Sequence, residues 1–578
     1  MLCGFLTGYA ENAPDDVRPG TFAALWALAD EVDRGKYWAY KGMDPSKQVI
    51  NHHPGIRHLG NKNLLNKNLR KAVRKFGAAI YDFVAPSFLL PRETIAFKAA
   101  LVEEEARRAK NKGLPPPVFI VKGAATDRGL GLLVVSGSAD VDRAVKQLKR
   151  DGAVAQRYVT RPYLLHASAA TTPGRQAARD AVAGRGMAAR TAAGARQHLP
   201  GHKFTLRLYV VLRSFDPTRA YLYREGLVHI ASVPYKHGPA HLANRVMQLT
   251  NPDIGGRLNP SYKKNPRPYY WRLTEVMAYV DEMHKLLADG DHNKANRRKQ
   301  KAKGDDPDGD GPTLFAVPPI EVWRRIHALV HKTVLAVEPG FVRREYDLGF
   351  NGPNLPCFEL LGFDVLLDAK LRPWLLEINP DPDMSAKRTF PLASTVKEQM
   401  LDDTLRLVGL REAPARGARA ALLSRALLAF AAAGKKRAPI PARLWELYGG
   451  NATAPEARLC PATGRGLAWA CPLAEEGEAL MLARAEIEHA QRGAYDRVPA
   501  ATAFPFEDGG DAEGGHDTLI IAKLSLFPEG PRRSDTLLAC WAASMNACGL
   551  RSLQTPAAGV AEMHRMATGA DSGLIPGN

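Results

Sequence analysis

Apolar and polar residues alternate along several stretches of the chain in the manner of β-strands. Strand patterns occur at residues 118–121, 132–135, 204–212, 220–223 and 227–233, with Glu225 and Gly226 between the last two. Apolar residues at helical spacing predict amphipathic helices at 320–337 and 396–408. Residues 49–120 carry mixed patterns, so helices and strands are both expected there.

Residues 357–384 hold the most informative pattern, two apolar runs around a polar turn at 368–373, which predicts a β-hairpin. Asp364 is expected at the head of the first strand. Glu377 and Asn379 end the second, and their two-residue offset puts both on one face. Three oxygen ligands from paired strands suit Mg²⁺, which leaves room for phosphate. The hairpin therefore predicts a metal–nucleotide site.

Residues 203–207 alternate, with Lys203, Thr205 and Arg207 on one face of a strand and Phe204 and Leu206 on the other. Two cations on one face would be costly against a core. They would suit a cleft that holds phosphate. A solvent-facing strand is the alternative.

A loop of small residues at 122–131 separates two of the predicted strands. Its backbone N–H groups could close over phosphates, with Lys122 and Arg128 as countercharge beside Gly129. An ordinary hairpin loop is the alternative, and the residue order excludes a P-loop. An edge that could offer backbone groups to an adenine, or could be an ordinary strand end, follows at Gln156, Arg157, Tyr158 and Val159.

Composition limits the class of protein. The chain has 578 residues, 45% of them hydrophobic, which allows two or three domains. The six cysteines lack Cys-x-x-Cys spacing, which argues against zinc and a disulfide scaffold and for a reducing compartment. The first residues lack a signal-peptide pattern. The longest apolar stretch, at 420–433, is too short to span a membrane, so no membrane partner is expected.

The formal net charge of +19 favours polyanionic partners, among them nucleic acid, anionic membranes and acidic protein tails. Arginine in Ala-rich spacers could also inflate this total. Two such segments look like flexible insertions, at 166–201 and at 289–313, where a basic run precedes an acidic one. From about residue 412 the chain is Ala-rich and reads as helical.

The patterns fall into one order: a phosphate loop, an adenine edge, a cationic strand and a metal hairpin. This order resembles the ATP-grasp fold, and the residues resemble the tubulin-tyrosine-ligase-like family. Residues 50–55 (INHHPG) are similar to that family's Asn-His-Phe-Pro-Gly, with Lys62 following, and 88–91 (FLLP) to its Phe-x-Leu-Pro. The resemblance continues at 122–131, 156–165, 203–207, 215–228, 241–244, the hairpin and 396–402, with a weaker echo at 486–499. The residues of these segments are most like those of the glutamate-adding branch of the family.

The resemblance implies an α/β (α+β) architecture with an ATP-grasp fold. The expected divisions are an N-terminal segment (1–48), an N-terminal domain (49–117), a central ATP-grasp domain (118–239), a C-terminal ATP-grasp domain (240–411) and a helical or irregular extension (412–578). The insertion 166–201 belongs to the central domain and 289–313 to the C-terminal one.

The resemblance also implies a ligase that joins glutamate to Glu side chains in acidic tubulin tails, with ATP and Mg²⁺ as cofactors. ATP phosphorylates the acceptor carboxylate and the incoming amine attacks the acyl phosphate, so catalysis is alignment plus charge neutralisation. Arg207 and Glu377 would be catalytic, and Mg²⁺ would take Asp364, Glu377 and Asn379. His229 and Lys397 would face the amino acid. ATP would contact Lys122, Arg128, Gly129, Gln156, Arg157, Tyr158, Val159, Lys203, Thr205 and Asn244.

Five positions depart from the family pattern. Thr205 replaces an acid, and Ala243 replaces a threonine. His229 stands for an arginine that grips the amino acid's carboxylate, and a neutral imidazole cannot form that bidentate fork. Asp381 and Asp383 add acids where small residues are usual. The phosphoryl-transfer residues are thus intact, whereas the amino-acid-selecting residues have changed.

The favoured interpretation is a tubulin polyglutamylase, with free glutamate and microtubules as partners. The alternatives are a glycylase, a ligase for another protein, and a catalytically weak homologue that binds microtubules. A nucleic-acid binder would explain the charge but none of the motifs. A monomer is expected, in the cytoplasm and on the cytoskeleton, with the cilium or basal body as further sites.

Overall fold

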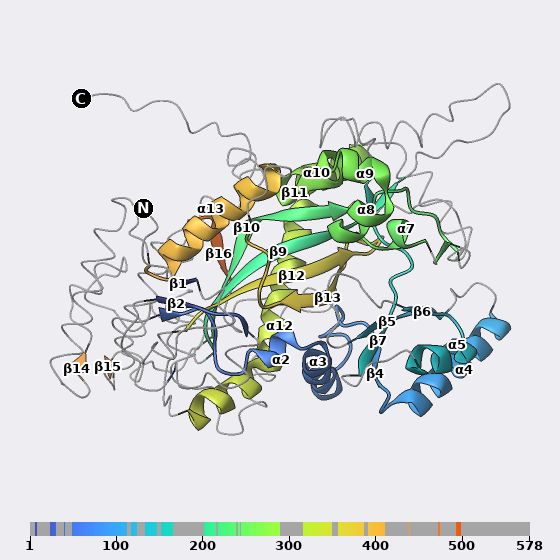
Figure 1. Ribbon diagram of the computed structural model, residues 1–578, viewed down its shortest axis with the longest axis horizontal. Coiled ribbons are helices and arrows are strands. Elements are labelled where there is room, and N and C mark those ends of the chain that lie inside the picture. The colour runs from blue at the N-terminus through green and yellow to red at the C-terminus, as the bar shows by residue number, and fades with distance from the viewer. Residues whose placement is uncertain are drawn as a thin grey trace.

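The computed structural model describes residues 6–7, 24–29, 40, 49–111, 117–123, 133–146, 152–165, 201–215, 218–238, 241–242, 244–289, 316–348, 357–385, 391–410, 438–439, 472–473 and 493–498. These residues form a mixed α/β structure whose two larger sheets are antiparallel (Figure 1). Within these ranges, no helix is long and apolar enough to cross a membrane.

The larger sheet has seven strands, all paired antiparallel. Its main path runs β11 (Tyr270–Arg272), β10 (Thr218–Ile230), β9 (His202–Phe215), β12 (Glu359–Leu367) and β13 (Pro373–Asn379). In addition, β16 (Tyr495–Val498) pairs with β10 and β8 (Leu164–Leu165) with β9.

The predicted hairpin is confirmed, because β12 and β13 are antiparallel neighbours. The expected place of Asp364 at the head of its strand is wrong. The strand begins earlier, at Glu359, because residues 359–363 also pair with β9. Asp364 therefore lies within the sheet and not at its end.

The prediction of two strands at 220–223 and 227–233 is also wrong, because β10 is continuous through Glu225 and Gly226. A register shift between Leu222 and Gly226 absorbs these residues as a bulge. A Cβ added at Gly226 would lie 2.7 Å from the carbonyl oxygen of Arg207. Only glycine allows this close approach of β10 to β9.

The two faces of the larger sheet pack against different helices. On β9, Phe204, Leu206 and Leu208 point into a core shared with α10 (Leu273–Asp289) and α12 (Pro319–Asp347). On the opposite face, Tyr209 packs in a second core with α13 (Pro391–Leu407). The predicted alternation of β9 is confirmed. The solvent-facing alternative is wrong, because Lys203 is only 5% exposed.

Both predicted long helices are present with different bounds. The helix predicted at 320–337 continues to Asp347 with Pro339 inside it. The helix predicted at 396–408 begins earlier, at Pro391, and ends at Leu407. Helical spacing predicted both helices but not their ends, since Phe341 and Ala393, outside the predicted bounds, also lie in the two cores.

The smaller sheet has the order β4 (Ser87–Leu90), β7 (Ala153–Arg157), β5 (Phe119–Gly123) and β6 (Leu133–Val135). The helices α4 (Thr94–Lys110) and α5 (Ser138–Lys146) pack on it around a separate core that includes Phe97 and Phe119. Figure 1 shows this unit beside the larger sheet, below β13. Both strands predicted around the phosphate loop are thus confirmed.

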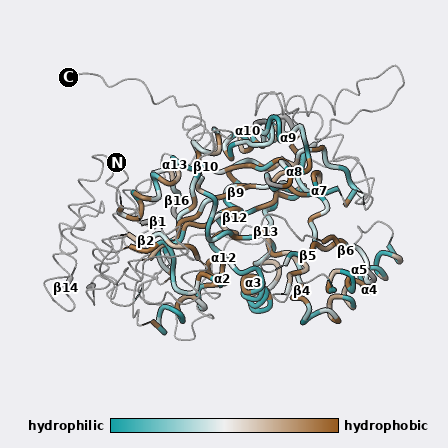
Figure 2. Tube along the Cα trace, in the orientation of Figure 1, coloured by the Kyte–Doolittle hydropathy of each residue, from teal (hydrophilic) through white to brown (hydrophobic). Residues whose placement is uncertain are grey.

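The helices α2 (Arg57–Gly60) and α3 (Lys62–Phe76) lie against α12, between the two sheets. The side chain of Asn61 caps α3 by accepting from the backbone N–H groups of Asn63 and Leu64. Leu65 and Leu69 face the core, while much of the rest of α3 is hydrophilic (Figure 2). This cap places Lys62 at the first turn of α3.

The remaining elements are short. A parallel sheet joins β1 (Leu6–Thr7), β2 (Ala24–Trp26) and β3 (Val49–Ile50). The others are α7 (Arg245–Gln248), α8 (Pro252–Leu258), α9 (Pro260–Lys264), η3 (Arg267–Tyr269), β14 (Ala438–Pro439) and β15 (Pro472–Leu473). The predicted insertions, at 166–201 and 289–313, fall outside the described residues except for their outermost positions, as does most of 412–578.

Candidate active site

One large cleft opens on the face of the larger sheet opposite the α10–α12 core, and it extends from the smaller sheet to α13. From β9 it is lined by Lys203, Thr205 and Arg207, and from the hairpin by Asp364 and Glu377. The structure brings further sequence-predicted residues to the same cleft, namely Lys122, Gln156, Arg157, Tyr158, Val159, His229, Asn379 and Lys397.

A bulge in β13 turns Glu377 into the cleft. Asp364 pairs with Glu377, and the next residue of β12 pairs with Leu375, so Leu376 is the extra residue. Leu375 and Ile378 are three positions apart, yet both are buried in the core. A regular strand would put these two on opposite faces. The bulge therefore brings the oxygen-bearing side chains of the hairpin to one face.

Asp364, Glu377 and Asn379 offer the oxygen donors that Mg²⁺ takes in proteins. Asn379 Nδ2 donates to Asp364 Oδ2 at 3.4 Å, and Asp364 is the direct neighbour of Glu377 across the ladder. Within the described ranges, no group of three or more His, Cys, Asp or Glu residues could hold a metal ion. Two carboxylates and an amide thus fit a magnesium site in which phosphate completes the coordination.

Arg207 is held beside this set by a bidentate pair. Its Nε and Nη2 donate to Asp364 Oδ1 and Oδ2 at 2.6 and 3.0 Å. Burial would lower the pKa of the guanidinium, but Asp364 raises it above its ordinary value. A Cβ on Gly362 would come within 3.2 Å of Arg207 Cδ, so this glycine leaves room for the side chain. Arg207 is therefore a fixed cation at the hairpin.

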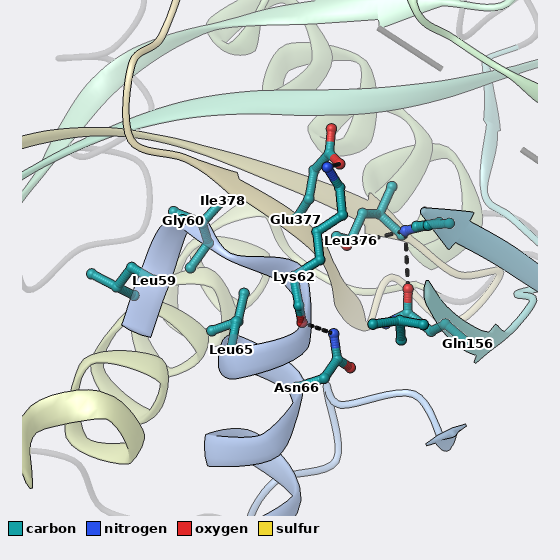
Figure 3. Close-up of a pocket in the computed structure, with 11 residues that line it drawn as sticks. Leu59, Gly60, Lys62, Leu65, Asn66, Gln156, Leu376, Glu377 and Ile378 are labelled. Carbon is teal, nitrogen blue, oxygen red and sulfur yellow. Dashed lines mark hydrogen bonds and ion pairs between the residues drawn. The ribbon is translucent and has the colours of Figure 1, made fainter. Parts of the chain in front are cut away.

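Two lysines from separate elements meet at the bulge. Lys122 of β5 donates from Nζ to the carbonyl oxygen of Leu376 at 3.1 Å and to Gln156 Oε1 at 3.0 Å. Lys62 of α3 approaches Glu377 Oε2 to 3.8 Å (Figure 3). Burial lowers the pKa of Lys122, and Glu377 opposes that shift. These contacts join the smaller sheet, α3 and the hairpin.

Lys203 is buried further along the cleft. Its Nζ donates to Tyr158 Oη at 2.6 Å and to the carbonyl oxygen of Gln248 at 3.0 Å, and it lies 4.4 Å from the Tyr158 ring centroid. Burial, and then the charge of Lys122, lowers the pKa of Lys203 to about 7. A bound anion would raise that pKa again.

Thr205 shares a 2.7 Å hydrogen bond with the hydroxyl of Thr250. Thr250 and Gln248 also line the cleft, and no periodic signal in the sequence marks either residue. The one available clue is local: Asn244 caps the short helix α7, which ends at Gln248 and is followed by Thr250 two residues later.

Some backbone groups of the proposed adenine-binding edge already form hydrogen bonds within the protein. The backbone N–H groups of Arg157 and Tyr158 donate to the carbonyl oxygens of Pro86 and Val118, both at 2.8 Å. The Arg157 side chain pairs with Glu104 of α4 at 2.5 Å. The segment lines the cleft, but the Arg157 guanidinium is directed to α4.

His229 and Lys397 lie at the α13 end of the cleft. Burial lowers the pKa of His229 to about 3, and the charges of Arg207 and Lys397 act in the same direction. Its ring meets Tyr270 edge-on at 5.4 Å. Lys397 Nζ donates to Asp383 Oδ2 at 3.1 Å and to the carbonyl oxygen of Ser385 at 3.3 Å. The lowered pKa favours the neutral imidazole of His229.

Three sequence-predicted site residues are not placed on the cleft wall. Arg128 and Gly129 lie outside the described residues, as does Ala243, where the family pattern has a threonine. Asn244 is described, but its side chain accepts from the backbone N–H of Met247 at 3.3 Å and does not line the cleft. Any contact of these residues with a nucleotide stays a prediction.

Comparison with known proteins gives a consistent family assignment. The model of the "Tubulin-tyrosine ligase family" matches residues 41–302 and 312–415. Human "Tubulin monoglutamylase TTLL4" is 29% identical over 390 residues, which are 64% of this chain and 25% of that protein. The "Probable beta-tubulin polyglutamylase" of Tetrahymena thermophila is 28% identical over 395 residues, 66% of this chain and 26% of its own.

A third relative, "Tubulin polyglutamylase ttll-4" of Caenorhabditis elegans, is 26% identical over 375 residues, 65% of this chain and 48% of that protein. The chain therefore spans between about a quarter and a half of the length of these curated relatives. The residues that the family model matches include the hairpin and most of the cleft lining.

Proposed function

Because the chain belongs to the tubulin-tyrosine ligase family, we propose that it is an ATP-dependent ligase that adds glutamate to Glu side chains in the acidic tails of tubulin. The relatives cited above are glutamylases by name. One observation carries the proposal: the oxygen donors of the hairpin line one cleft together with Lys122, Lys203 and Arg207. Phosphoryl transfer needs this arrangement of cations and metal ligands.

In this reaction ATP phosphorylates the acceptor carboxylate, and the amine of glutamate attacks the acyl carbon, so that an amide forms and phosphate leaves. Arg207 would stabilise the charge on the acyl phosphate. Mg²⁺, held by Asp364, Glu377 and Asn379, would neutralise charge on the phosphates. The groups that would position ATP are Lys122, Arg128, Gly129, the segment 156–159, Lys203, Thr205 and Asn244.

We propose the ATP-grasp fold for the two sheets and the cleft between them. The N-terminal domain would be 49–117, the central domain 118–239 and the C-terminal domain 240–411, with 1–48 and 412–578 as flanking segments. The partners would be free glutamate and microtubules, bound by a monomer in the cytoplasm, on the cytoskeleton or in the cilium. The net charge of +19 would favour the encounter with acidic tails.

Glycine is the second candidate for the added amino acid. His229 stands where a cation would grip a substrate carboxylate, and its pKa of about 3 keeps it neutral. A neutral residue there weakens the selection of a dicarboxylic amino acid. Glutamate stays first because the relatives cited above are named for it.

Incubation of the full chain with tubulin, Mg²⁺-ATP and one labelled amino acid at a time tests the proposal. We expect incorporation of glutamate above glycine and tyrosine. Glu377→Gln should abolish it, because the amide keeps the shape and removes a metal-binding charge. Glu398→Gln, at an exposed site on α13, is the control with the same charge change. If the unmutated chain incorporates none of the three, the ligase proposal is wrong.

A further inference from the structure

The chain that follows β13 turns back over the α13 end of the cleft, and residues 380–385 form what we call the return segment. Pro382 packs on the sheet here: a Cβ added at Gly362 would lie 3.3 Å from Pro382 Cβ. Gly362 is also the residue that leaves room for Arg207. The return segment therefore passes directly beside Arg207.

An acid on either side of Pro382 anchors this segment. Asp381 accepts from the backbone N–H of Ala29, at 3.3 and 3.2 Å to its two oxygens, and lies 3.4 Å from His52 Nε2. Burial alone would lower the pKa of His52, but Glu359 and Asp381 raise it to about 10. His52 is thus a buried cation that holds Asp381, and Asp381 fixes the N-terminal side of the return segment.

Asp383 is directed to the other side, toward α13. Its Oδ1 accepts from the backbone N–H of Ser385 at 2.9 Å, and its Oδ2 accepts from Lys397 Nζ at 3.1 Å. The Lys397 side chain is 12% exposed and that of Asp383 is 60% exposed. Asp383 thus brings a carboxylate from the open side of the cleft onto a largely buried ammonium.

The charges around this pair make it relevant to substrate binding. Lys397 and Arg207 both line the cleft and both act on His229. Arg207 is paired with Asp364, and Lys397 with Asp383. Each of these cations therefore already holds a carboxylate of the protein. A substrate carboxylate that needs Lys397 has to share it with Asp383 or displace it.

We propose that Asp383 sets the affinity of the cleft for the amino-acid substrate, because its carboxylate occupies on Lys397 the place that the substrate carboxylate takes during the reaction. The inference rests on the proposed ligase function, and it names Lys397 as the substrate carboxylate's partner. Asp383 weakens the binding of carboxylate-bearing amino acids at this end and so sets the concentration at which the protein uses them. Asp383 therefore competes with the substrate carboxylate for Lys397.

Asp383→Asn tests this inference, because asparagine keeps the size of the side chain and removes its charge. Its single oxygen can accept from Ser385 as Asp383 Oδ1 does, while Lys397 loses the carboxylate oxygen on the other side. We expect the dissociation constant of glutamate, measured by calorimetry with Mg²⁺-ATP present, to fall about tenfold, the equivalent of about 1.4 kcal/mol. In the ligation assay the KM for glutamate should fall by the same factor while kcat changes less than about twofold. Glu398→Gln, which changes the net charge equally, should alter neither quantity.

A double-mutant cycle separates the pair from the general field of the cleft. Lys397→Met should weaken glutamate binding about tenfold or more, and in that background Asp383→Asn should have almost no effect. If Asp383→Asn leaves the dissociation constant unchanged or raises it, the inference is wrong. It is also wrong if the substitution tightens binding equally with and without Lys397. Binding decides these outcomes even if no amino acid is ligated, an outcome that would refute only the proposed function.

Discussion

The cations at the two ends of the cleft have different hydrogen-bond acceptors. At the end that faces the smaller sheet, Lys122 and Lys203 donate to uncharged oxygens, those of Gln156, Tyr158 and two backbone carbonyls. At the α13 end, Arg207 and Lys397 donate to carboxylates, Asp364 and Asp383. All four cations line the same cleft, Lys203 and Arg207 from β9 of the larger sheet, Lys122 from the smaller sheet and Lys397 from α13.

The difference teaches how each end meets an anion. Burial lowers the pKa of both Lys122 and Lys203, so each is a desolvated cation that an incoming phosphate would stabilise. The cations near α13 are already stabilised by carboxylates, and an anion there has to compete. We therefore expect the first end to bind ATP strongly and the second end to select its substrate by exchange of partners.

Arg207→Lys should give the largest effect, because it breaks the bidentate fork to Asp364 while keeping the charge. We expect kcat to fall about 10²- to 10³-fold, the usual loss for a removed transition-state donor, with the KM for ATP changed much less. Steady-state kinetics at saturating tubulin measure both. Arg224→Lys is the control, since Arg224 forms a similar half-buried pair with Asp496 outside the cleft lining. A loss below tenfold would contradict the assignment.

Lys203→Met should give the next largest effect, and it tests whether the end of the cleft that faces the smaller sheet binds ATP. The loss of a charged hydrogen-bond donor costs about 1.5–3 kcal/mol, so ATP should bind roughly 10- to 150-fold more weakly. Calorimetric titration with Mg²⁺-ATP measures it. Lys98→Met removes a lysine that pairs with Asp142 on the surface of α4 and should leave ATP binding intact. Equal affinities for the two variants would remove Lys203 from the nucleotide site.

The smallest expected effect is a pH dependence. Since burial lowers the pKa of Lys203 to about 7 and phosphate raises it, ATP binding takes up a proton above pH 7. The affinity for ATP should therefore fall as the pH rises from 7 to 9, by at most about tenfold per unit. Titrations in buffers of different ionisation enthalpy should detect the proton. The slope should disappear in Lys203→Met, and an unchanged slope would assign it to another group.

Sequence patterns predicted the elements that carry chemistry better than the contacts between them. Alternation identified the faces of β9 and the hairpin, because a period of two fixes which side chains are buried. The bulge at Leu376 has no such signal, since a register shift is set by the partner strand. The pair Lys397–Asp383 and the contact of Lys203 with Gln248 depend on how distant segments fold together, which local periodicity does not encode.

The strand β16 decides where a shortened form of this chain can end. The family match ends at residue 415, but Tyr495 of β16 is fully buried, and its hydroxyl lies 2.6 Å from that of Thr404 on α13. A chain that stopped at 415 would leave the β10 edge at 220–223 without the partner it has in the structure. An unpaired edge of this kind invites intermolecular pairing and aggregation. A soluble, shortened form for biochemistry should therefore retain the chain through Val498.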